Sequence, residues 1–406
     1  MAVRDVDATD PLEMEEELVA RAAALGPQLR KTAAETEANR AVLKENMQAL
    51  FDNQLLRFFQ PKRHGGFELE WGAQFSIGRE VAKHCPSTAW IVAVVGAHAA
   101  FLGRMPGAVQ DEVWGPKQDQ LICTGSVKRH GTAVRENDGI RVKGQWAFFS
   151  GCDHADWAMF PVTVEGDKTP TQVVVPRSDW EIADTWHVAG MRGTGTKDIV
   201  VDDAFVPAHR TLAAPEWLAA NPPGSKVNDS YIYRVNFLPY VGTSLLGPLL
   251  GTAEGAYNDY CAISAKRVGS MTGEAVADNA PVQLRVAESA AELHAADVIM
   301  TEQIAYLREM GRKGAAIPAA KRLEINRDRS FVAKLCIQST ERLAGMMGAM
   351  GIFDSNPVQR HLRDVNGMAT QIGINWDRNM LPYGKWALGL PTGDPHVDQE
   401  LGRAAS

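Results

Sequence analysis

Apolar side chains in the first part of the chain recur with helical spacing. Between Glu15 and Leu29, the apolar residues Leu18, Val19, Ala22, Ala23 and Leu25 form a stripe, and charged residues stand between them in the sequence. This spacing predicts an amphipathic helix. Residues 32–50 are rich in Ala, Glu, Lys and Leu, which are good helix formers. A break and helix start at Pro86-Ser-Thr precede a further helix at Trp90–Leu102.

From about Pro116 the spacing changes to that of strands. Polar Arg141, Lys143 and Gln145 separate apolar or small residues at Ile140, Val142, Gly144, Trp146 and Phe148. This period of two predicts a strand with these five residues on one face. A hairpin-turn signal at residues 136–139 precedes it, and residues 171–176 and 198–202 are further strand candidates.

After a Pro- and Gly-rich loop at residues 221–225, the pattern is helical again. The segments Val282–Gly311 and Lys321–Met350 are long enough to pack as a bundle. We therefore predict four parts: an N-terminal helical domain (1–115), a middle β domain (116–220), a C-terminal helical bundle (221–396) and a polar tail (397–406). The first residues, 1–11, are also polar.

Composition narrows the classes of function. The 406 residues carry 42 Lys and Arg against 49 Asp and Glu, a net charge of −7, which argues against nucleic acid as a partner. The longest apolar run, Trp90–Leu102, is too short to cross a bilayer, and the acidic start lacks the apolar core of a signal peptide. The five scattered cysteines fit no disulfide framework, so we expect a cytoplasmic protein without membrane contact.

Two local motifs do not carry the chemistry that they resemble at first sight. The glycines of Gly190–Gly195 resemble a dinucleotide fingerprint, but a strand pattern follows where a helix is needed. The segment Cys152–Asp156 has metal-capable side chains, but neighbouring strand residues point to opposite faces and no second cluster supports it. We expect no metal site.

Three motifs carry a family resemblance. They are Gly144–Gly151 (GQWAFFSG) with His154–Trp157 after it, Asp184–Asp198 (DTWHVAGMRGTGTKD) followed by VVDDAFVP, and Arg360–Asp364 (RHLRD). With the order of helical, β and helical regions, they resemble the two-component flavin-dependent monooxygenases of the acyl-CoA dehydrogenase fold. The resemblance covers roughly residues 18–390 and is closest to the p-hydroxyphenylacetate hydroxylase oxygenases and the steroid-degrading phenol hydroxylases.

The resemblance implies a fold and a reaction. The fold is mainly α, with an N-terminal helical domain, a middle β-barrel or sandwich and a C-terminal four-helix bundle, usually in a homotetramer. A separate NAD(P)H-dependent flavin reductase supplies reduced flavin, usually FMN, with FAD as the alternative. On the oxygenase, the reduced flavin reacts with O₂ to form a C4a-hydroperoxyflavin. This species hydroxylates a small electron-rich aromatic molecule, phenolic or indole-type. The protein orients the reactants, excludes water and controls protons.

The resemblance also assigns residues to the flavin. Ser150 is expected near N5 and the C4 carbonyl of the flavin, where its hydroxyl can donate, and Thr124, Gly125 and Ser126 at the pyrimidine edge. Trp146 belongs to the same cofactor-binding motif. Arg267 is expected against the flavin phosphate, often from a neighbouring subunit, because a guanidinium fork suits phosphate. From the residues alone, Ser150 could instead bond its own backbone, and Arg267 could be a solvated cation at a helix end.

Trp90 and His98 are candidate substrate contacts. They are eight residues apart, about two helical turns, and so lie on nearly the same face of one helix. In the p-hydroxyphenylacetate hydroxylases a Trp and a His at this spacing face the site, and the His contacts the substrate hydroxyl. A His could polarise a phenol or an indole N–H, but it could also be a core residue bonded to a carbonyl. Thr124 and Trp376 are further candidates.

The chain departs from the family after the Arg360–Asp364 motif. Asn366 and Gln371 stand where family members usually carry histidines, and an amide cannot shuttle a proton near pH 7. We expect Asn366 or Gln371 to take the place of the missing histidine without transferring a proton. The substrate should then need little base assistance, as an indole-type ring does. The alternatives are N- or S-oxygenation on the same fold, or acyl-CoA dehydrogenation. The latter needs a carboxylate base, for which Asp377 is the available substitute.

Overall fold

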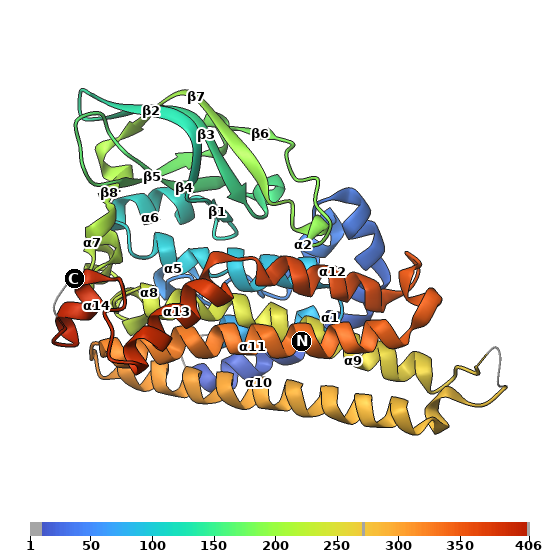
Figure 1. The fold of residues 1–406 in the computed structure, drawn as a ribbon. Helices are drawn as coiled ribbons and strands as arrows, with labels where there is room; N and C mark the ends of the chain where they lie inside the picture. Colours follow the sequence, from blue (N-terminus) through green and yellow to red (C-terminus); the bar gives the residue numbers. More distant parts are fainter. Residues whose placement is uncertain (1–9, 270–272, 404–406) are drawn as a thin grey trace.

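Helices build the first and last parts of the chain, and strands build the middle, as the patterns predict (Figure 1). The computed structural model describes residues 10–269 and 273–403, so most of the expected N-terminal polar segment lies outside the described residues. The N-terminal helices are α1 (Pro11–Asn39), α2 (Lys44–Asp52), α3 (Ala73–Ala82), α4 (Pro86–Trp90), α5 (His98–Leu102) and α6 (Gly107–Trp114).

The first helix is longer than the apolar stripe that predicted it. It continues through residues 32–39 and ends where Arg40 takes a left-handed conformation with φ 53°. The Arg40 backbone N–H donates to the Glu37 carbonyl at 3.2 Å, which closes the last turn. The helix formers of residues 32–50 are therefore divided between α1 and α2, with Ala41 and Val42 buried between them.

The predicted helix Trp90–Leu102 consists of three pieces. Between α4 and α5 lies a π-helical turn, η2 (Ile91–Val95), in which the Gly96 N–H donates to the Ile91 carbonyl at 3.0 Å. Single π turns inside helices are frequent at functional sites. This wider turn changes the rotation between Trp90 and His98, and both side chains line the same cavity.

Two four-stranded sheets form the middle part. One sheet pairs β1 parallel with β4 and then β5 and β8 antiparallel; the other is antiparallel throughout, in the order β2, β3, β7 and β6. Their bounds are β1 (Ile122–Thr124), β2 (Val127–Glu136), β3 (Gly139–Phe149), β4 (Trp157–Val162), β5 (Thr171–Pro176), β6 (Glu181–Ala183), β7 (Lys197–Pro207) and β8 (Thr211–Ala213). Buried side chains such as Val142, Trp146 and Phe160 fill the space between the sheets.

A bulge in β3 breaks the predicted alternation. The pairing of β3 with β7 is irregular between Trp146 and Phe149, and Phe148 has a left-handed φ of 68°. Phe148 is therefore 47% exposed, while its neighbours Ala147 and Phe149 are buried. The expectation that Phe148 shares the buried face of Trp146 is wrong, because the bulge re-aims this side chain.

The helices after β8 include a bundle in which α10, α11 and α12 pack around α9, which is buried along most of its length. They are α7 (Ala214–Leu218), α8 (Leu238–Val241), α9 (Thr243–Ser264), α10 (Ala280–Arg312), α11 (Ala319–Met346), α12 (Pro357–Ala369), α13 (Trp376–Ala387) and α14 (Pro395–Glu400). Helix α9 contacts α10, α11 and α12 within the bundle and α3 from the N-terminal region. Figure 1 shows the strands as a layer over one side of these helices.

Close approach of α3 to α9 depends on three glycines spaced four residues apart. A Cβ atom on Gly247, Gly251 or Gly255 would lie within 3 Å of the backbone of α3 or of the residue after it: 2.3 Å from Phe75 O, 2.1 Å from Arg79 O and 2.9 Å from Lys83 O. Glycine lets the two helix backbones touch at these positions. The N-terminal helices and the C-terminal bundle therefore share one packed interface.

Near the end of the described residues, a helix begins before the polar tail that we expected and continues into it. Helix α14 crosses the predicted boundary at residue 397. Glu400 holds it in place, because its carboxylate accepts the Ala319 N–H at 2.6 Å and pairs with Arg322 at 2.9 Å. Among the described residues, no helix combines the length and the apolar character needed to cross a membrane.

Candidate active site

A cavity of about 1850 Å³ lies where the sandwich, the N-terminal helices and the C-terminal helices meet. The sequence predicted eleven site residues, and eight of them line this cavity. These eight come from all three parts of the chain: Trp90, His98, Thr124, Gly125, Ser126, Ser150, Asn366 and Gln371. The fold therefore gathers most of the predicted residues around one space.

Four buried side chains form a continuous hydrogen-bonded chain on the cavity wall. The Trp90 Nε1–H donates to Ser150 Oγ at 3.1 Å, and Ser150 Oγ lies 2.8 Å from Thr196 Oγ1. Thr196 Oγ1 lies 2.6 Å from Thr194 Oγ1, which donates to the Met191 carbonyl at 2.8 Å. We call these four residues, Trp90, Ser150, Thr196 and Thr194, the hydroxyl chain.

The local backbone explains how the hydroxyl chain is assembled. Ser150 follows the bulged end of β3, and Thr194 ends a short 3₁₀ turn, η5 (Arg192–Thr194). Met191 and Gly195 both have left-handed φ angles, 60° and 56°, and the chain turns sharply at each. Thr196 directly precedes β7, which pairs with β3. The two threonine hydroxyls are thereby brought up to Ser150.

His98 is held by both of its ring nitrogens. Its Nδ1 lies 2.8 Å from the Ile122 carbonyl, and its Nε2 lies 3.1 Å from Thr124 Oγ1. Since a carbonyl only accepts, Nδ1 carries the proton and Nε2 is the unprotonated nitrogen. Burial lowers the pKa of His98 to about 4, so the ring is neutral at ordinary pH.

A buried carboxyl group supports the η5 turn from behind. Asp364 Oδ1 accepts the Met191 N–H at 2.6 Å, and burial raises the pKa of Asp364 to about 7. The α12 backbone packs directly on Gly190, where a Cβ atom would lie 2.1 Å from the Arg363 carbonyl. The Arg360–Asp364 motif therefore holds the turn that carries Thr194.

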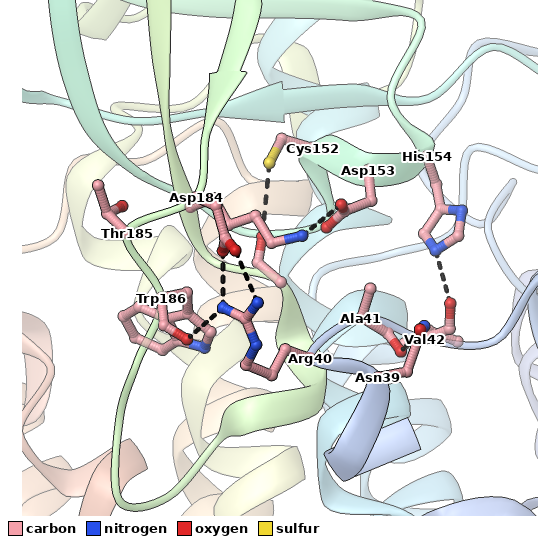
Figure 2. Close-up of polar contacts among 12 residues, drawn as sticks. Asn39, Arg40, Ala41, Val42, Cys152, Asp153, His154, Asp184, Thr185 and Trp186 are labelled. Carbon is pink, nitrogen blue, oxygen red and sulfur yellow. Dashed lines mark hydrogen bonds and ion pairs between the residues drawn. The ribbon is translucent and has the colours of Figure 1, made fainter. Parts of the chain in front are cut away.

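The aromatic side of the cavity is tied to the end of α1. Arg40 forms a two-pronged pair with Asp184, with both N–O distances 2.6 Å, and its guanidinium also reaches the Trp186 carbonyl at 3.5 Å (Figure 2). The Trp186 indole donates to the Met191 carbonyl at 2.9 Å. Trp186 lines the cavity. The loop that carries it is held at Asp184 by Arg40 and at Met191 by the Trp186 indole.

Comparison with known proteins identifies the family. A family model described as "Acyl-CoA dehydrogenase, C-terminal domain" matches residues 244–376. The chain is 32% identical to "Flavin-dependent monooxygenase, oxygenase subunit HsaA" of Rhodococcus jostii (strain RHA1), over 92% of this chain and 99% of that protein. This chain belongs to the flavin-dependent monooxygenases. The predicted family, fold class and enzyme class are thereby confirmed.

Two further comparisons agree with this assignment. The monooxygenase is 33% identical to "FADH(2)-dependent resorcinol hydroxylase, oxygenase component" of Rhizobium sp. (strain MTP-10005), over 92% of this chain and 94% of that protein. Its fold matches XiaF from Streptomyces sp., solved in complex with FADH2 and glycerol, with a TM-score of 0.87 and 26% identity. That match covers 95% of this chain and 98% of XiaF.

The cavity of the monooxygenase suits a flavin ring. Phe148 and Trp186 line it with ring centroids 6.4 Å apart and ring planes at 87°, a pair of aromatic walls. The hydroxyl chain and Thr124–Ser126 supply polar groups. Small-molecule pockets usually measure about 300–1,000 Å³, so this cavity has room for a flavin and a second aromatic molecule.

Three predicted site residues do not line the cavity, and two of them, Trp146 and Trp376, have other surroundings within the chain. Trp146 points into the sandwich core, where its ring centroid lies 4.6 Å from that of Phe160. The bulge after it sends Phe148 to the cavity in its place. Trp376 is 41% exposed at the start of α13, with the Lys334 ammonium 4.7 Å from its ring centroid. Both assignments are therefore corrected.

Three other candidates have partners or positions that limit their roles. Arg267 does not line the cavity of its own chain and donates to the Met346 carbonyl at 3.5 Å, so its predicted phosphate contact requires a neighbouring subunit. Gln371 accepts the Gly373 N–H at 2.5 Å, and exposed Asn366 donates to the Leu362 carbonyl at 3.0 Å. Asp377, the substitute base of a dehydrogenase, is exposed and outside the cavity lining.

The metal-capable segment Cys152–His154 has ordinary structural partners. Asp153 pairs with Lys197 at 2.5 Å, and His154 Nε2 lies 2.7 Å from the Val42 carbonyl (Figure 2). Cys152 Sγ lies 3.5 Å from the Gly195 carbonyl. Within residues 10–269 and 273–403, no group of three His, Cys, Asp or Glu side chains could hold a metal ion.

Sequence reasoning missed Phe148, Trp186, Thr194, Thr196 and Asp364. Four of these residues line the cavity, and Asp364 supports it. All five stand inside the three motifs that carried the resemblance. The alternation of Thr and Gly in residues 193–196 was a usable signal, because it places two hydroxyls in a backbone that needs sharp turns.

Proposed function

We propose that this monooxygenase hydroxylates a phenolic molecule with reduced flavin supplied by a separate reductase. The observation that carries the proposal is the neutral His98, with Nε2 bonded to Thr124 at the cavity wall. The named substrate of the 33% identical relative, resorcinol, is a phenol and supports the same class. Ser150 and Thr196 face the flavin ring in this proposal, and Thr124–Ser126 lie at its polar edge.

His98 and Thr124 act together on the phenolic group. Thr124 donates its only proton to His98 Nε2, so its oxygen keeps lone pairs that can accept the phenolic O–H. The pKa of His98, about 4, lies far below that of a phenol, so the pair orients and polarises the substrate rather than removing its proton. A polarised phenolic oxygen makes the ring richer in electrons, which oxygen transfer requires.

The remaining walls of the cavity keep water from the reaction. The bound reduced flavin supplies the activation of O₂. Trp90, Phe148, Met191 and Trp186 give the cavity an apolar lining next to the hydroxyl chain. Such a lining protects a reactive centre from solvent and strengthens the hydrogen bonds inside it. Neither Asn366 nor Gln371 carries proton transfer here, since the His98–Thr124 pair addresses the substrate.

A product assay with labelled oxygen tests the proposal. The enzyme would receive chemically reduced FMN or FAD without oxygen and then ¹⁸O₂ with a panel of matched phenols and indoles. We expect one ¹⁸O atom in a hydroxylated phenol and little hydroxylated indole. The Thr124→Ala variant should lose phenol product while it still consumes flavin. Indole products alone, or full phenol hydroxylation by Thr124→Ala, would overturn the proposal.

We also propose that the chain assembles as a homotetramer through its C-terminal bundle. Most of the exposed large apolar side chains in the described residues follow Gly242, among them Leu284, Ile352, Phe353, Leu381 and Leu388. Exposed apolar side chains in such number are typical of an interaction surface. Light scattering during size-exclusion chromatography gives the mass in solution, and a monomeric mass would refute the assembly.

A further inference from the structure

The hydroxyl chain has a fixed direction because its two ends differ. At one end the Trp90 indole can only donate, and at the other end the Met191 carbonyl can only accept. Each of the three hydroxyl groups between them has a single proton. The Met191 carbonyl also accepts the Trp186 indole N–H at 2.9 Å and the Thr194 backbone N–H at 3.2 Å, and as a carbonyl it has no proton to offer to Thr194 Oγ1.

Only one placement of protons satisfies all of these contacts. Thr194 gives its proton to the Met191 carbonyl, so Thr196 must donate to Thr194 across 2.6 Å. Ser150 must then donate to Thr196 across 2.8 Å, and it accepts the Trp90 N–H at 3.1 Å. Any reversal would place two oxygen atoms in contact without a proton between them, which is costly for buried groups.

A ligand in the cavity therefore meets only hydrogen-bond acceptors at the hydroxyl chain. The hydroxyl protons of Ser150, Thr196 and Thr194 are all used inside the hydroxyl chain, and only lone pairs remain for a ligand. This differs from the expectation that Ser150 donates to the flavin. A ligand atom that contacts Ser150 must bring its own N–H or O–H.

Reduced and oxidised flavin differ in this respect. The reduced ring carries a proton on N5, whereas the oxidised ring has a lone pair there. We propose that Thr196 and Thr194 are specificity-determining residues that make the site prefer reduced over oxidised flavin, by fixing Ser150 as an acceptor. The inference rests on the proposed function, in which the flavin ring contacts Ser150.

The two ends of the hydroxyl chain have unequal importance for this preference. The direction is set at the Met191 carbonyl, because Thr194 must donate there. Removal of Thr196 or Thr194 frees the Ser150 proton to turn into the cavity. Removal of the Trp90 N–H leaves Ser150 still donating to Thr196, so the preference should remain.

Binding measurements test this without catalysis. The Kd values of reduced FMN, measured anaerobically, and of oxidised FMN would be determined for the wild type, Thr196→Val and Thr194→Val. We expect the ratio of oxidised to reduced Kd to fall about tenfold in Thr196→Val, and in the same direction in Thr194→Val. Thr340→Val is the matched control, since Thr340 is buried in α11 and bonds the Cys336 carbonyl away from the cavity. Its ratio should equal that of the wild type.

Two further variants separate the ways in which the idea can fail. Trp90→Phe should keep the ratio, and a collapse there as large as in Thr196→Val would contradict the assigned direction. Ser150→Ala should weaken binding of reduced FMN. If Ser150→Ala changes neither Kd, the placement of the flavin in the proposed function is wrong. If Ser150→Ala weakens binding but both threonine variants keep the wild-type ratio, only the present inference is overturned.

Discussion

The cavity has two walls that hold their polar groups in different ways. The buried wall consists of buried His98, the buried hydroxyl chain and half-buried Thr124, whose polar side-chain atoms are hydrogen-bonded within the protein. Of the polar lining residues that follow α11, Asn366, Arg378, Asp394 and His396 are exposed and Gln371 is half-buried, and we call these five the C-terminal wall; Asn379 and Thr392 in the same part are buried.

This difference separates two tasks. On the buried wall each proton has a defined place, so the wall is organised for one chemical step before any ligand arrives. On the C-terminal wall the exposed side chains can adapt to different groups at little cost. We therefore expect substitutions in the buried wall to affect the reaction, and substitutions in the C-terminal wall to affect the range of substrates.

The largest effect is expected when the two cavity histidines are compared. His98→Ala should lower kcat/KM for the phenolic substrate about a thousandfold, because it removes the buried acceptor that organises Thr124. His396→Ala, on the C-terminal wall, should change it less than threefold. Steady-state kinetics with a saturating supply of reduced flavin measures both values. Equal losses in the two variants would remove the distinction between the walls.

Asp364, behind the buried wall, should make stability depend on pH. Its pKa is raised from 3.8 to about 7, so its contribution is present below pH 4 and is lost as the pH rises through 7. Asp364→Asn keeps an acceptor for Met191 and stays neutral. The free energy of unfolding of the wild type should fall relative to this variant by about 4 kcal/mol between pH 4 and pH 8. Urea unfolding across this range measures it.

The control for this comparison is Asp377→Asn. Asp377 is exposed at the start of α13 and outside the cavity, so this variant removes a carboxyl group without touching the Met191 contact. If Asp364→Asn runs parallel to the wild type, Asp364 is charged in the folded protein, and the support behind the buried wall is electrostatic rather than a neutral hydrogen bond.

A moderate effect is expected from outside the cavity. Arg40→Ala removes the pair with Asp184 and the contact with the Trp186 carbonyl, so the aromatic side should be held less firmly. We expect an increase of about threefold in the Kd of reduced flavin, as suits a partly exposed ion pair. Arg21→Ala, which breaks a pair with Glu17, should leave this Kd unchanged. Anaerobic titration decides between them.

The smallest effect is expected at Gln371, although a histidine is usual there. Gln371→His places an imidazole on the C-terminal wall, while the His98–Thr124 pair already addresses the substrate. Turnover of simple phenols should therefore change less than twofold. A large gain would show that a second imidazole is missing from the site, and it would favour the indole-type substrate that the sequence suggested.

Regular elements were predictable where a simple period continues. The strand at residues 171–176 has the predicted bounds, and α10 extends the predicted helix Val282–Gly311 by at most two residues at each end. The predicted segments that differ contain a local event with no periodic signal. Arg40 ends α1 in a left-handed conformation, and a π turn divides Trp90–Leu102. Both events depend on contacts with distant residues.

The same reason explains the outcome at the site. Motif resemblance found His98, Thr124 and Ser150, but it placed Trp146 at the cofactor site, where the structure has Phe148. The bulge that exchanges their roles lies in the pairing of β3 with β7, some fifty residues away along the chain. The direction of the hydroxyl chain was also hidden, because it follows from the Met191 carbonyl and not from the residue types of Ser150, Thr194 and Thr196.

The glycine stripe of α9 has a consequence for how the protein is made. Helix α3 needs Gly247, Gly251 and Gly255 as its packing surface, and the whole β region is synthesised between them. The face of α3 that packs on these glycines therefore stays uncovered until α9 has been synthesised. The sandwich, whose core is made of residues from its own region, can fold in that interval, before the surface that joins the N-terminal helices to the bundle exists.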